Sequence, residues 1–344
     1  MKQTIWRSAQ TIGHRPSIIT RKFTRAVSLR PYQEQCIEAS LASFQKGTNR
    51  IAVSLATGSG KTGKYMINPV IFINLINRLL MQSKQSPKPK ILVLAHRKEL
   101  LFQPFRYFER HFPDIKVSIE QGNKRCDADS DVVLASIATL GGANQGRISR
   151  FNPDEFGMIV IDEAHHASAK MYQNILQYFK VYNEGSTMKV YGCSATLRRH
   201  DGISLYPTFE EIAYTKTVFS MLEEGWLCDI KVSTVNTSTS LDGVKSISGD
   251  YSTKMLAQTC NTQERNSAVL KVYINHAQKA NCHSTIIFAI NVAHIDALVT
   301  MFQSNGIDAR GVSGLTNSLH REVLINEFSL GKFPVLVNCG AYFK

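Results

Sequence analysis

The sequence lacks any paired-cysteine pattern. Its 344 residues include seven cysteines, an odd number, with no CxxC pair among them. This argues against a disulfide framework and against a zinc site built from paired cysteines, and we expect buried thiols in a reducing compartment. The neighbouring residues His165 and His166 do not belong to an HExxH pattern, so they do not predict a protein-bound zinc.

Long hydrophobic runs are also lacking. The nearest, residues 66–81, is interrupted by Asn68, Asn74, Asn77 and Arg78. We therefore expect a core-packed helix there and no membrane partner. With 43% hydrophobic and 19% charged residues, the chain has an ordinary globular composition and is long enough for two domains.

Acidic residues are missing from the first thirty positions, and the first carboxylate is Glu34. The basic residues of this stretch are Lys2, Arg7, Arg15, Arg21, Lys22, Arg25 and Arg30. A basic, Ser- and Thr-rich start without a continuous apolar core is typical of a mitochondrial transit peptide rather than a secretory signal. We expect residues 1–28 to direct the chain to the matrix, although a basic arm that contacts nucleic acid is the alternative.

A glycine-rich turn follows an apolar run at residues 51–62, IAVSLATGSGKT. Glycines let backbone N–H groups wrap a phosphate chain, and a helix N-terminus behind them favours negative charge. The predicted ATP-binding residues of this turn are Thr57, Gly58, Ser59, Gly60, Lys61 and Thr62. Lys61 is expected to reach the β and γ phosphates and Thr62 to hold Mg²⁺. Leu55 departs from the usual pattern, which opens with Gly or Ala.

A second motif, MIVIDEAH at residues 158–165, runs from a buried strand into two adjacent carboxylates. In a nucleotide hydrolase Asp162 would hold Mg²⁺, and Glu163 would orient and deprotonate the attacking water. Both roles need the carboxyl end of a strand, where an open α/β sheet binds its ligand. A solvated Asp-Glu turn is the alternative, and the fully apolar run before it disfavours that alternative.

Other polar residues follow predicted strands or helices. The amide of Gln33 both donates and accepts, as contact with the adenine edge requires. The predicted nucleic-acid-binding residues, which follow the strands at 91–95 and 131–135, are His96, Arg97, Lys98, Ser136 and Thr139. Such groups can contact a phosphate backbone, although a solvated helix start accounts for the first three nearly as well.

Apolar strands alternate with helical segments over the first two thirds of the chain, which predicts an α/β fold with a doubly wound parallel sheet. Pro69 is expected to kink or end the helix after the phosphate loop near Asn68. In the remainder we expect strands at 230–235, 284–290 (buried) and 333–337, and helices at 294–302 and 317–328.

The motifs LRPYQ, LATGSGKT, LAHRKELLFQ, DEAH and SAT occur in this order from residue 29 to residue 196. In order and rough spacing they resemble the Q motif and motifs I, Ia, II and III of superfamily 2 helicases. Further segments, RRHDG, EEGWLCDI, GDYSTKMLAQTCNTQERN and PVLVNCG, resemble the fungal "increased recombination centres" mitochondrial ATP-dependent DNA helicases. The combination is far more specific than any single motif.

The resemblance implies two RecA-like lobes in an enzyme that hydrolyses ATP with Mg²⁺ on DNA, and no protein partner is evident. By position, the residues it implies for catalysis are Lys61, Asp162 and Glu163; for Mg²⁺, Thr62 and Asp162; for adenine, Gln33; and for coupling, His165, Ser194 and Thr196. Leu197 stands where relatives often have proline, which changes the local turn but no catalytic group.

The expected domains are a transit peptide at 1–28, an ATP-binding lobe at 29–225 and an incomplete second lobe at 226–344. The chain has no Q-x-x-G-R-x-x-R segment, which carries the arginine fingers in this family, and residues 333–337 would then lack a neighbour on one side of their sheet. The alternatives are therefore a nucleotide- and DNA-binding protein with little turnover and, less favoured, an RNA helicase.

Overall fold

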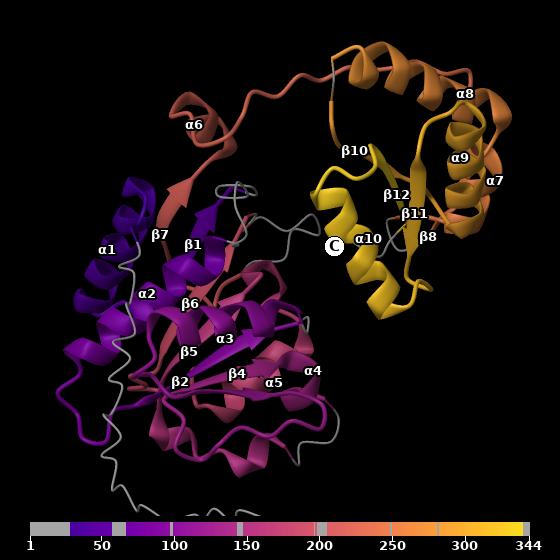
Figure 1. Ribbon diagram of the computed structural model, residues 1–344. Helices are drawn as coiled ribbons and strands as arrows, with labels where there is room; N and C mark the ends of the chain where they lie inside the picture. The colour runs from indigo at the N-terminus through magenta and orange to yellow at the C-terminus, as the bar shows by residue number, and fades with distance from the viewer. Residues whose placement is uncertain are drawn as a thin grey trace, which may run out of the picture. The chain divides into compact units, whose positions relative to one another are not determined.

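The computed structural model describes residues 28–56, 67–96, 99–142, 147–195, 197, 205–247, 250–280 and 282–339. The chain divides into two compact units, Met1–Ile230 and Lys231–Lys344 (Figure 1). Nearly all of the predicted transit peptide and the whole predicted phosphate loop, residues 57–62, lie outside the described residues.

The first unit is built on a seven-stranded parallel sheet with the order β3-β4-β2-β5-β6-β1-β7. Its strands are β1 (Arg50–Leu55), β2 (Lys90–Ala95), β3 (Val117–Glu120), β4 (Val132–Ser136), β5 (Phe156–Asp162), β6 (Lys189–Ser194) and β7 (Glu211–Lys216). Its helices are α1 (Pro31–Gln45), α2 (Ile67–Gln82), α3 (Glu99–His111), α4 (Ile137–Leu140), α5 (Lys170–Tyr178) and α6 (Val218–Glu223), with short 3-10 turns η1 (Ile148–Arg150), η2 (Pro153–Glu155) and η3 (Ala164–His166).

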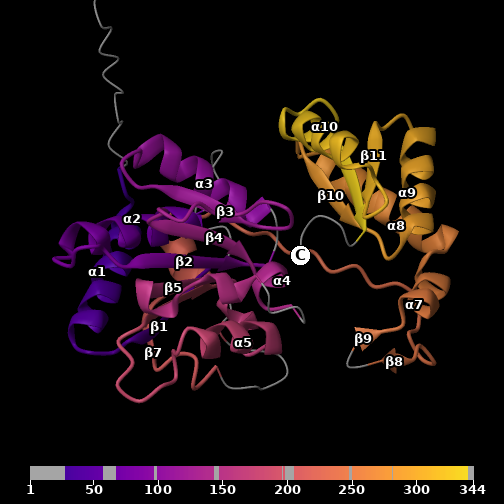
Figure 2. The same ribbon diagram turned by 90° about the horizontal axis from the view of Figure 1, so that it is seen from below.

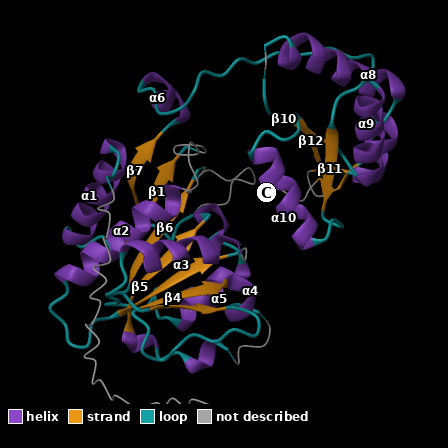
Figure 3. Cartoon of the chain, viewed as in Figure 1, coloured by secondary structure: helices purple, strands orange, loops and turns teal. Residues whose placement is uncertain are grey.

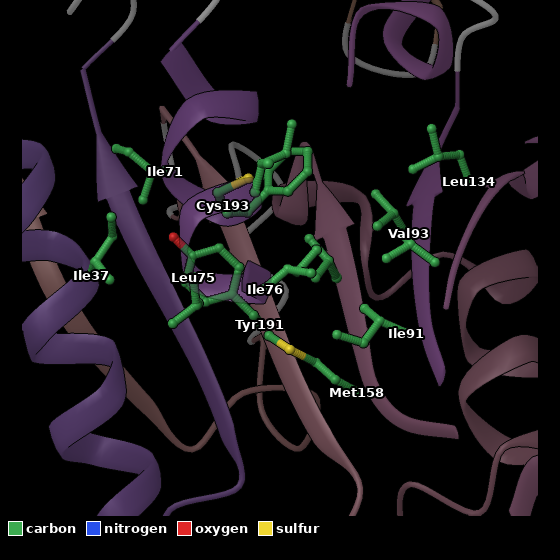
Figure 4. Packing of buried hydrophobic residues seen from close by; sticks show 14 of the residues in the cluster. Ile37, Ile71, Leu75, Ile76, Ile91, Val93, Leu134, Met158, Tyr191 and Cys193 are labelled. Atoms are coloured by element: carbon green, nitrogen blue, oxygen red, sulfur yellow. The ribbon is translucent and has the colours of Figure 1, made fainter. Parts of the chain in front are cut away.

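Each central strand is apolar on both faces because helices cover both. On one face, side chains of α1, α2 and α3 pack on alternate strand residues such as Val93 and Tyr191. Figure 4 shows this face, with Ile37, Leu75 and Ile76 from the helices close to the strand residues. On the other face, α4 and α5 pack on the intervening strand residues. The predicted doubly wound parallel sheet is confirmed.

The second unit contains a three-stranded parallel sheet with the order β10-β12-β11 and a small antiparallel hairpin. Its elements are β8 (Ser246–Ile247), β9 (Asp250–Tyr251), α7 (Thr253–Cys260), α8 (Gln263–Val272), a π-helical turn η4 (Tyr273–Gln278), β10 (Thr285–Phe288), α9 (Val292–Ser304), β11 (Ala309–Ser313), α10 (Ser318–Ser329) and β12 (Val335–Cys339). Figure 2 shows α9 and α10 on opposite sides of the sheet.

α2 continues past Pro69 to Gln82, so the helix does not end near Asn68, and the alternative of a kink there stays a prediction because residues 57–66 lie outside the described residues. Two other sequence predictions about elements are wrong in detail. Residues 230–235 alternate in polarity but form exposed loop, drawn in teal in Figure 3, and no described strand pairs with them. The strand expected to be buried at 284–290 is β10, which is half exposed because it is an edge strand.

The last strand is also placed differently from the expectation. Instead of forming an exposed edge, β12 lies at the centre and pairs with β10 on one side and β11 on the other. The neighbour that the sequence analysis did not predict is β11, because its sequence ARGVS has too little apolar character to indicate a strand. In the part of the chain that the structure describes, no helix is both long and apolar enough to cross a membrane.

Candidate functional site

The candidate site lies at the carboxyl end of β5, near the middle of the first sheet. In the register of the sheet, Ile161 pairs with Leu94 of β2, and Asp162 pairs with Cys193 of β6. Because all of these strands are parallel, the residues that follow them gather at one edge, which is where such sheets bind ligands. The predicted motifs around His96, Asp162 and Ser194 therefore meet at this edge.

Asp162 is almost completely buried, with 6% of its surface exposed. Its Oδ1 accepts a hydrogen bond from the Glu163 N–H at 3.0 Å, and the Cys193 Sγ lies 3.4 Å from the same oxygen. Burial, and then the charge of Asp162, raise the pKa of the Cys193 thiol well above its ordinary value, so the sulfur stays protonated and can donate. The carboxylate is thus held by two donors, one from the turn that follows its own strand and one from the neighbouring strand β6.

The donor chemistry at this position fits Mg²⁺. A carboxylate oxygen is a ligand that Mg²⁺ prefers, and in nucleotide sites this ion is usually held by one or two carboxylates plus substrate phosphates. Among the described residues, no group of three or more His, Cys, Asp or Glu side chains forms a site for a metal ion. Asp162 is thus a carboxylate that could hold Mg²⁺ in company with phosphate oxygens, and Thr62, the other predicted ligand, lies outside the described residues.

Glu163 makes the sharp turn out of β5. It has a positive φ of 56°, a conformation that is uncommon for residues other than glycine and that often marks functional sites. The following turn, η3, then packs closely on β6. A Cβ added at Gly192 would come within 2.9 Å of the Ala164 Cβ and within 2.3 Å of the Phe209 ring, so this approach requires glycine.

His165 links the turn that carries Asp162 and Glu163 to the neighbouring strand β6. Its Nδ1 lies 2.8 Å from the Ser194 Oγ, which is hydrogen-bonding distance, and 3.4 Å from the Glu163 Oε2. A change at Ser194 can therefore reach Glu163 through one imidazole. Thr196, the third predicted coupling residue, lies outside the described residues.

Tyr172 of α5 lies near the same carboxylates and was not identified from the sequence. Burial, and then the charges of Asp162 and Glu163, raise its pKa, so its hydroxyl stays protonated. Among the described atoms this hydroxyl is buried without a hydrogen-bond partner. A tyrosine on an amphipathic helix gives no signal that would separate it from an ordinary core residue.

Gln33 is buried, with 6% of its surface exposed, rather than a surface residue. Its Oε1 accepts the Arg30 N–H at 2.9 Å, which fixes the orientation of the amide and leaves this oxygen one further lone pair. The preceding residue, Tyr32, packs with Ala56, the last described residue before the phosphate loop. The structure therefore brings the start of α1 close to the start of that loop.

The predicted nucleic-acid-binding residues differ in their exposure to solvent. His96 is exposed directly after β2, whereas Ser136 is buried at the end of β4. The Thr139 Oγ1 accepts the Gly122 N–H at 3.2 Å, so it links α4 to the turn after β3. Predicted site residues outside the described residues are Thr57, Gly58, Ser59, Gly60, Lys61, Thr62, Arg97, Lys98 and Thr196.

Comparison with known protein families shows to which family this chain is related. Residues 26–199, half of the chain, match the family described as type III restriction enzyme, res subunit, or ResIII. The chain belongs to the ResIII family. The match covers both motif-bearing strand ends and ends three residues after Thr196.

Two fungal proteins are similar to this ResIII chain over most of its length. The chain is 37% identical over 338 residues to IRC3 of Saccharomyces cerevisiae, covering 97% of this chain and 47% of that protein. It is also 37% identical over 323 residues to irc3 of Schizosaccharomyces pombe, covering 94% of this chain and 50% of that protein. Both names designate an ATP-dependent helicase, and the second adds mitochondrial. The chain spans about half the length of these relatives. The predicted resemblance to such helicases is confirmed.

Solved structures support the fold of this ResIII chain. The helicase domain of Pyrococcus furiosus Hef matches with a TM-score of 0.55 and 17% identity, covering 91% of this chain and 88% of that chain. The ATP-dependent type ISP restriction-modification enzyme LlaBIII, bound to DNA, matches with a TM-score of 0.62 and 14% identity. The match covers 92% of this chain and 24% of that chain. At these identities the likeness concerns the fold, and it agrees with two parallel α/β lobes.

Proposed function

We propose that this protein is an ATP-dependent helicase or translocase that acts on DNA. The observation that carries the proposal is the pair Asp162 and Glu163 at the carboxyl end of β5, with His165 between Glu163 and Ser194. The names of the two fungal relatives support the same activity.

The proposed chemistry assigns one task to each carboxylate. When bound, Mg²⁺ would neutralise charge on the β and γ phosphates. Asp162, whose Oδ1 is held by the Glu163 N–H and the Cys193 thiol, presents its carboxylate to that ion. Glu163 orients the attacking water and accepts its proton. The His165 Nδ1, 3.4 Å from the Glu163 Oε2, is close enough to influence the orientation of that carboxylate.

Enzyme assays test the proposal directly. We expect phosphate release that increases when DNA is added, and a loss of about 10²-fold or more in Glu163→Gln with unchanged affinity for a fluorescent ATP analogue. Glu184→Gln, an exposed carboxylate in a turn of the same unit, is the matched control and should behave as the unmodified chain. If Glu163→Gln weakened nucleotide binding and left turnover intact, the role of Glu163 would be refuted.

The proposed substrate is DNA, contacted through phosphates rather than base edges. Positive residues follow β2 in the sequence, and the chain carries a net charge of +13. Binding should therefore weaken with salt and depend little on sequence. Titrations at several salt concentrations with DNA and RNA of the same sequence test this. Binding without turnover would identify the alternative, a nucleotide- and DNA-binding protein, and stimulation by RNA alone would identify an RNA helicase.

The proposed location is the mitochondrial matrix. The name of the Schizosaccharomyces pombe relative supports it, as does the basic, acid-free stretch at residues 1–28. A reporter fused to this segment should enter isolated mitochondria, driven by the matrix-negative potential. A reporter that stays outside would contradict the assignment.

A further inference from the structure

A row of three imidazoles crosses the turn after β5. The rings of His165 and His166 lie with centroids 4.0 Å apart, and the ring of His166 lies edge-on to His96 with centroids 5.4 Å apart. At its other end, the row reaches Ser194 and Glu163 through the Nδ1 of His165. The row therefore runs from His96, the residue directly after β2, to the proposed catalytic base.

The topology of the sheet explains why two consecutive histidines have different partners. β5 lies between β2 and β6, so the turn after β5 has the end of β2 on one side and the end of β6 on the other. His166 contacts the β2 side through His96, and His165 contacts the β6 side through Ser194. Both residues belong to η3 and their rings are in contact, so a displacement of this turn moves both rings.

η3 is supported closely enough to transmit such a displacement. Ala164 and Ala167, which flank the two histidines, are both completely buried. Ala164 packs against Gly192, where no Cβ could be accommodated. The backbone of η3 thus packs on β6. Its two imidazoles contact residues at the ends of the neighbouring strands, His96 after β2 and Ser194 of β6.

We propose that His96 and His166 form the contact that couples nucleic-acid binding to the Glu163 site. Arg97 and Lys98, the predicted phosphate-binding residues, follow His96 directly in the sequence. A nucleic acid that contacts His96, itself one of the predicted nucleic-acid-binding residues and exposed, would change the ring contact between His96 and His166, and through η3 the position of His165 against Glu163. His166 is then a positioning residue that acts through its ring contacts with His96 and His165, and the inference rests on the proposed function.

Reciprocal binding measures this coupling without requiring turnover. The affinity for a fluorescent ATP analogue with Mg²⁺ is determined with and without a saturating DNA oligonucleotide, and the ratio of the two dissociation constants is the coupling factor. The variants are His166→Ala, His166→Phe, which keeps a ring, and His320→Ala, which changes an exposed histidine of α10 as a matched control. His96→Ala, alone and combined with His166→Ala, completes a double-mutant cycle.

We expect His166→Ala to bind each ligand separately as the unmodified chain does, while its coupling factor falls by about three- to tenfold, the range given by losing one aromatic contact. His166→Phe should keep most of the coupling, and His96→Ala should add no further loss of coupling to His166→Ala. A merely structural role would not change the ratio while preserving both separate affinities.

The opposite results overturn the inference in distinguishable ways. If the unmodified chain shows DNA-dependent nucleotide affinity and His166→Ala shows the same factor, the inference is wrong while the proposed function stands. If His166→Ala weakens either separate affinity, or if His166→Phe fails as His166→Ala does, the ring contact is not the carrier. If the unmodified chain binds both ligands without coupling, the inference is wrong while the proposed function stands. If it binds no nucleotide or no DNA, the proposed function loses its basis, and the inference falls with it.

Discussion

The proposed metal-binding carboxylate has a thiol as one of its partners. Cys193 Sγ lies 3.4 Å from the Asp162 Oδ1 and 3.8 Å from the Ile161 carbonyl oxygen, and the residue is 1% exposed. Because its pKa is raised by burial, the thiol remains a donor and restrains one oxygen of Asp162. Groups that orient metal ligands in this way often change metal affinity strongly when removed.

We expect Cys193→Ala to raise the Mg²⁺ concentration needed for half-maximal binding of an ATP analogue by about tenfold, the lower end of such effects, because a thiol is a weak donor. Cys193→Ser should retain most of the affinity, since its hydroxyl also donates. Cys36→Ala is the matched control, because this buried thiol lies 4.0 Å from the Tyr191 Oη and does not contact Asp162. An unchanged Mg²⁺ midpoint in Cys193→Ala would contradict the orienting role.

The sequence indicated the placement of candidate site residues best where chemistry requires a fixed residue type at the end of an apolar strand. Asp162, Glu163 and Ser194 follow such strands, and the structure brings them together. Contacts made across the sheet are not visible in this way. His96 and His166 are 70 positions apart, and only the pairing of β2 with β5 makes them neighbours.

At the scale of elements, the strands that the sequence predicted and those it did not differ in position within the sheets. The central strands β1, β2, β4, β5 and β6 are covered on both faces and are nearly continuous apolar runs. The strands that were not predicted are β3, β7 and β11, each at the edge of its sheet, and the two short strands of the β8-β9 hairpin. The edge strand β10 was predicted nonetheless. An edge strand is less enclosed, so it tolerates polar residues that obscure its pattern.

The edge strand β3 ends in a completely buried carboxylate, Glu120. The Arg147 Nε donates to the Glu120 Oε1 at 2.6 Å, and its guanidinium also donates to the carbonyl oxygens of Gly122 and Lys124, each at 2.7 Å. The ion pair therefore holds the turn after β3 against the chain that follows α4. Arg150 lies 3.7 Å from the other carboxylate oxygen.

We expect Arg147→Met to lower the free energy of unfolding of the first unit by about 3 kcal/mol, because it leaves a buried carboxylate without its main partner. The expectation is at the lower end of the range for such changes because Arg150 still lies nearby. Denaturant titration measures the effect. Glu120→Gln combined with Arg147→Met should recover part of the loss. Lys116→Met, which breaks an exposed pair with Asp129, is the control and should have little effect. If Arg147→Met and Lys116→Met lowered the free energy of unfolding equally, burial of Glu120 would not be the cause of the effect.

At the scale of the whole molecule, the chain consists of two units with separate hydrophobic cores. The clusters of the first unit contain residues from α1 to α5 and its seven-stranded sheet, and those of the second contain residues from α8 to α10 and its own sheet. The sequence predicted a second domain from residue 226, and the two compact units divide after Ile230. Each unit can therefore respond to conditions that act on its own groups.

His294 gives the second unit a dependence on pH. Its Nε2 lies 3.0 Å from the Asn266 Oδ1, and its Nδ1 accepts the Ile290 N–H at 3.3 Å. Burial, and then the charge of Arg265, hold the pKa of His294 below its ordinary value of 6.5. Above this pH the ring is neutral in the folded and unfolded chain. Below it, the unfolded chain takes up a proton that the folded unit resists, so the stability of the second unit falls as the pH falls.

We therefore expect calorimetry to resolve two unfolding transitions that respond to different conditions. Lowering the pH from about 7.5 to about 5.5 should lower the transition of the second unit through His294, and His294→Asn should weaken this response, although the variant is less stable at neutral pH. An ATP analogue with Mg²⁺ at about 100 times its dissociation constant should instead stabilise the first unit by about 2.7 kcal/mol, because its proposed nucleotide-binding residues lie there. A single transition that shifts as a whole under both conditions would show that the units unfold together. An acid response that persists unchanged in His294→Asn would assign it to other groups.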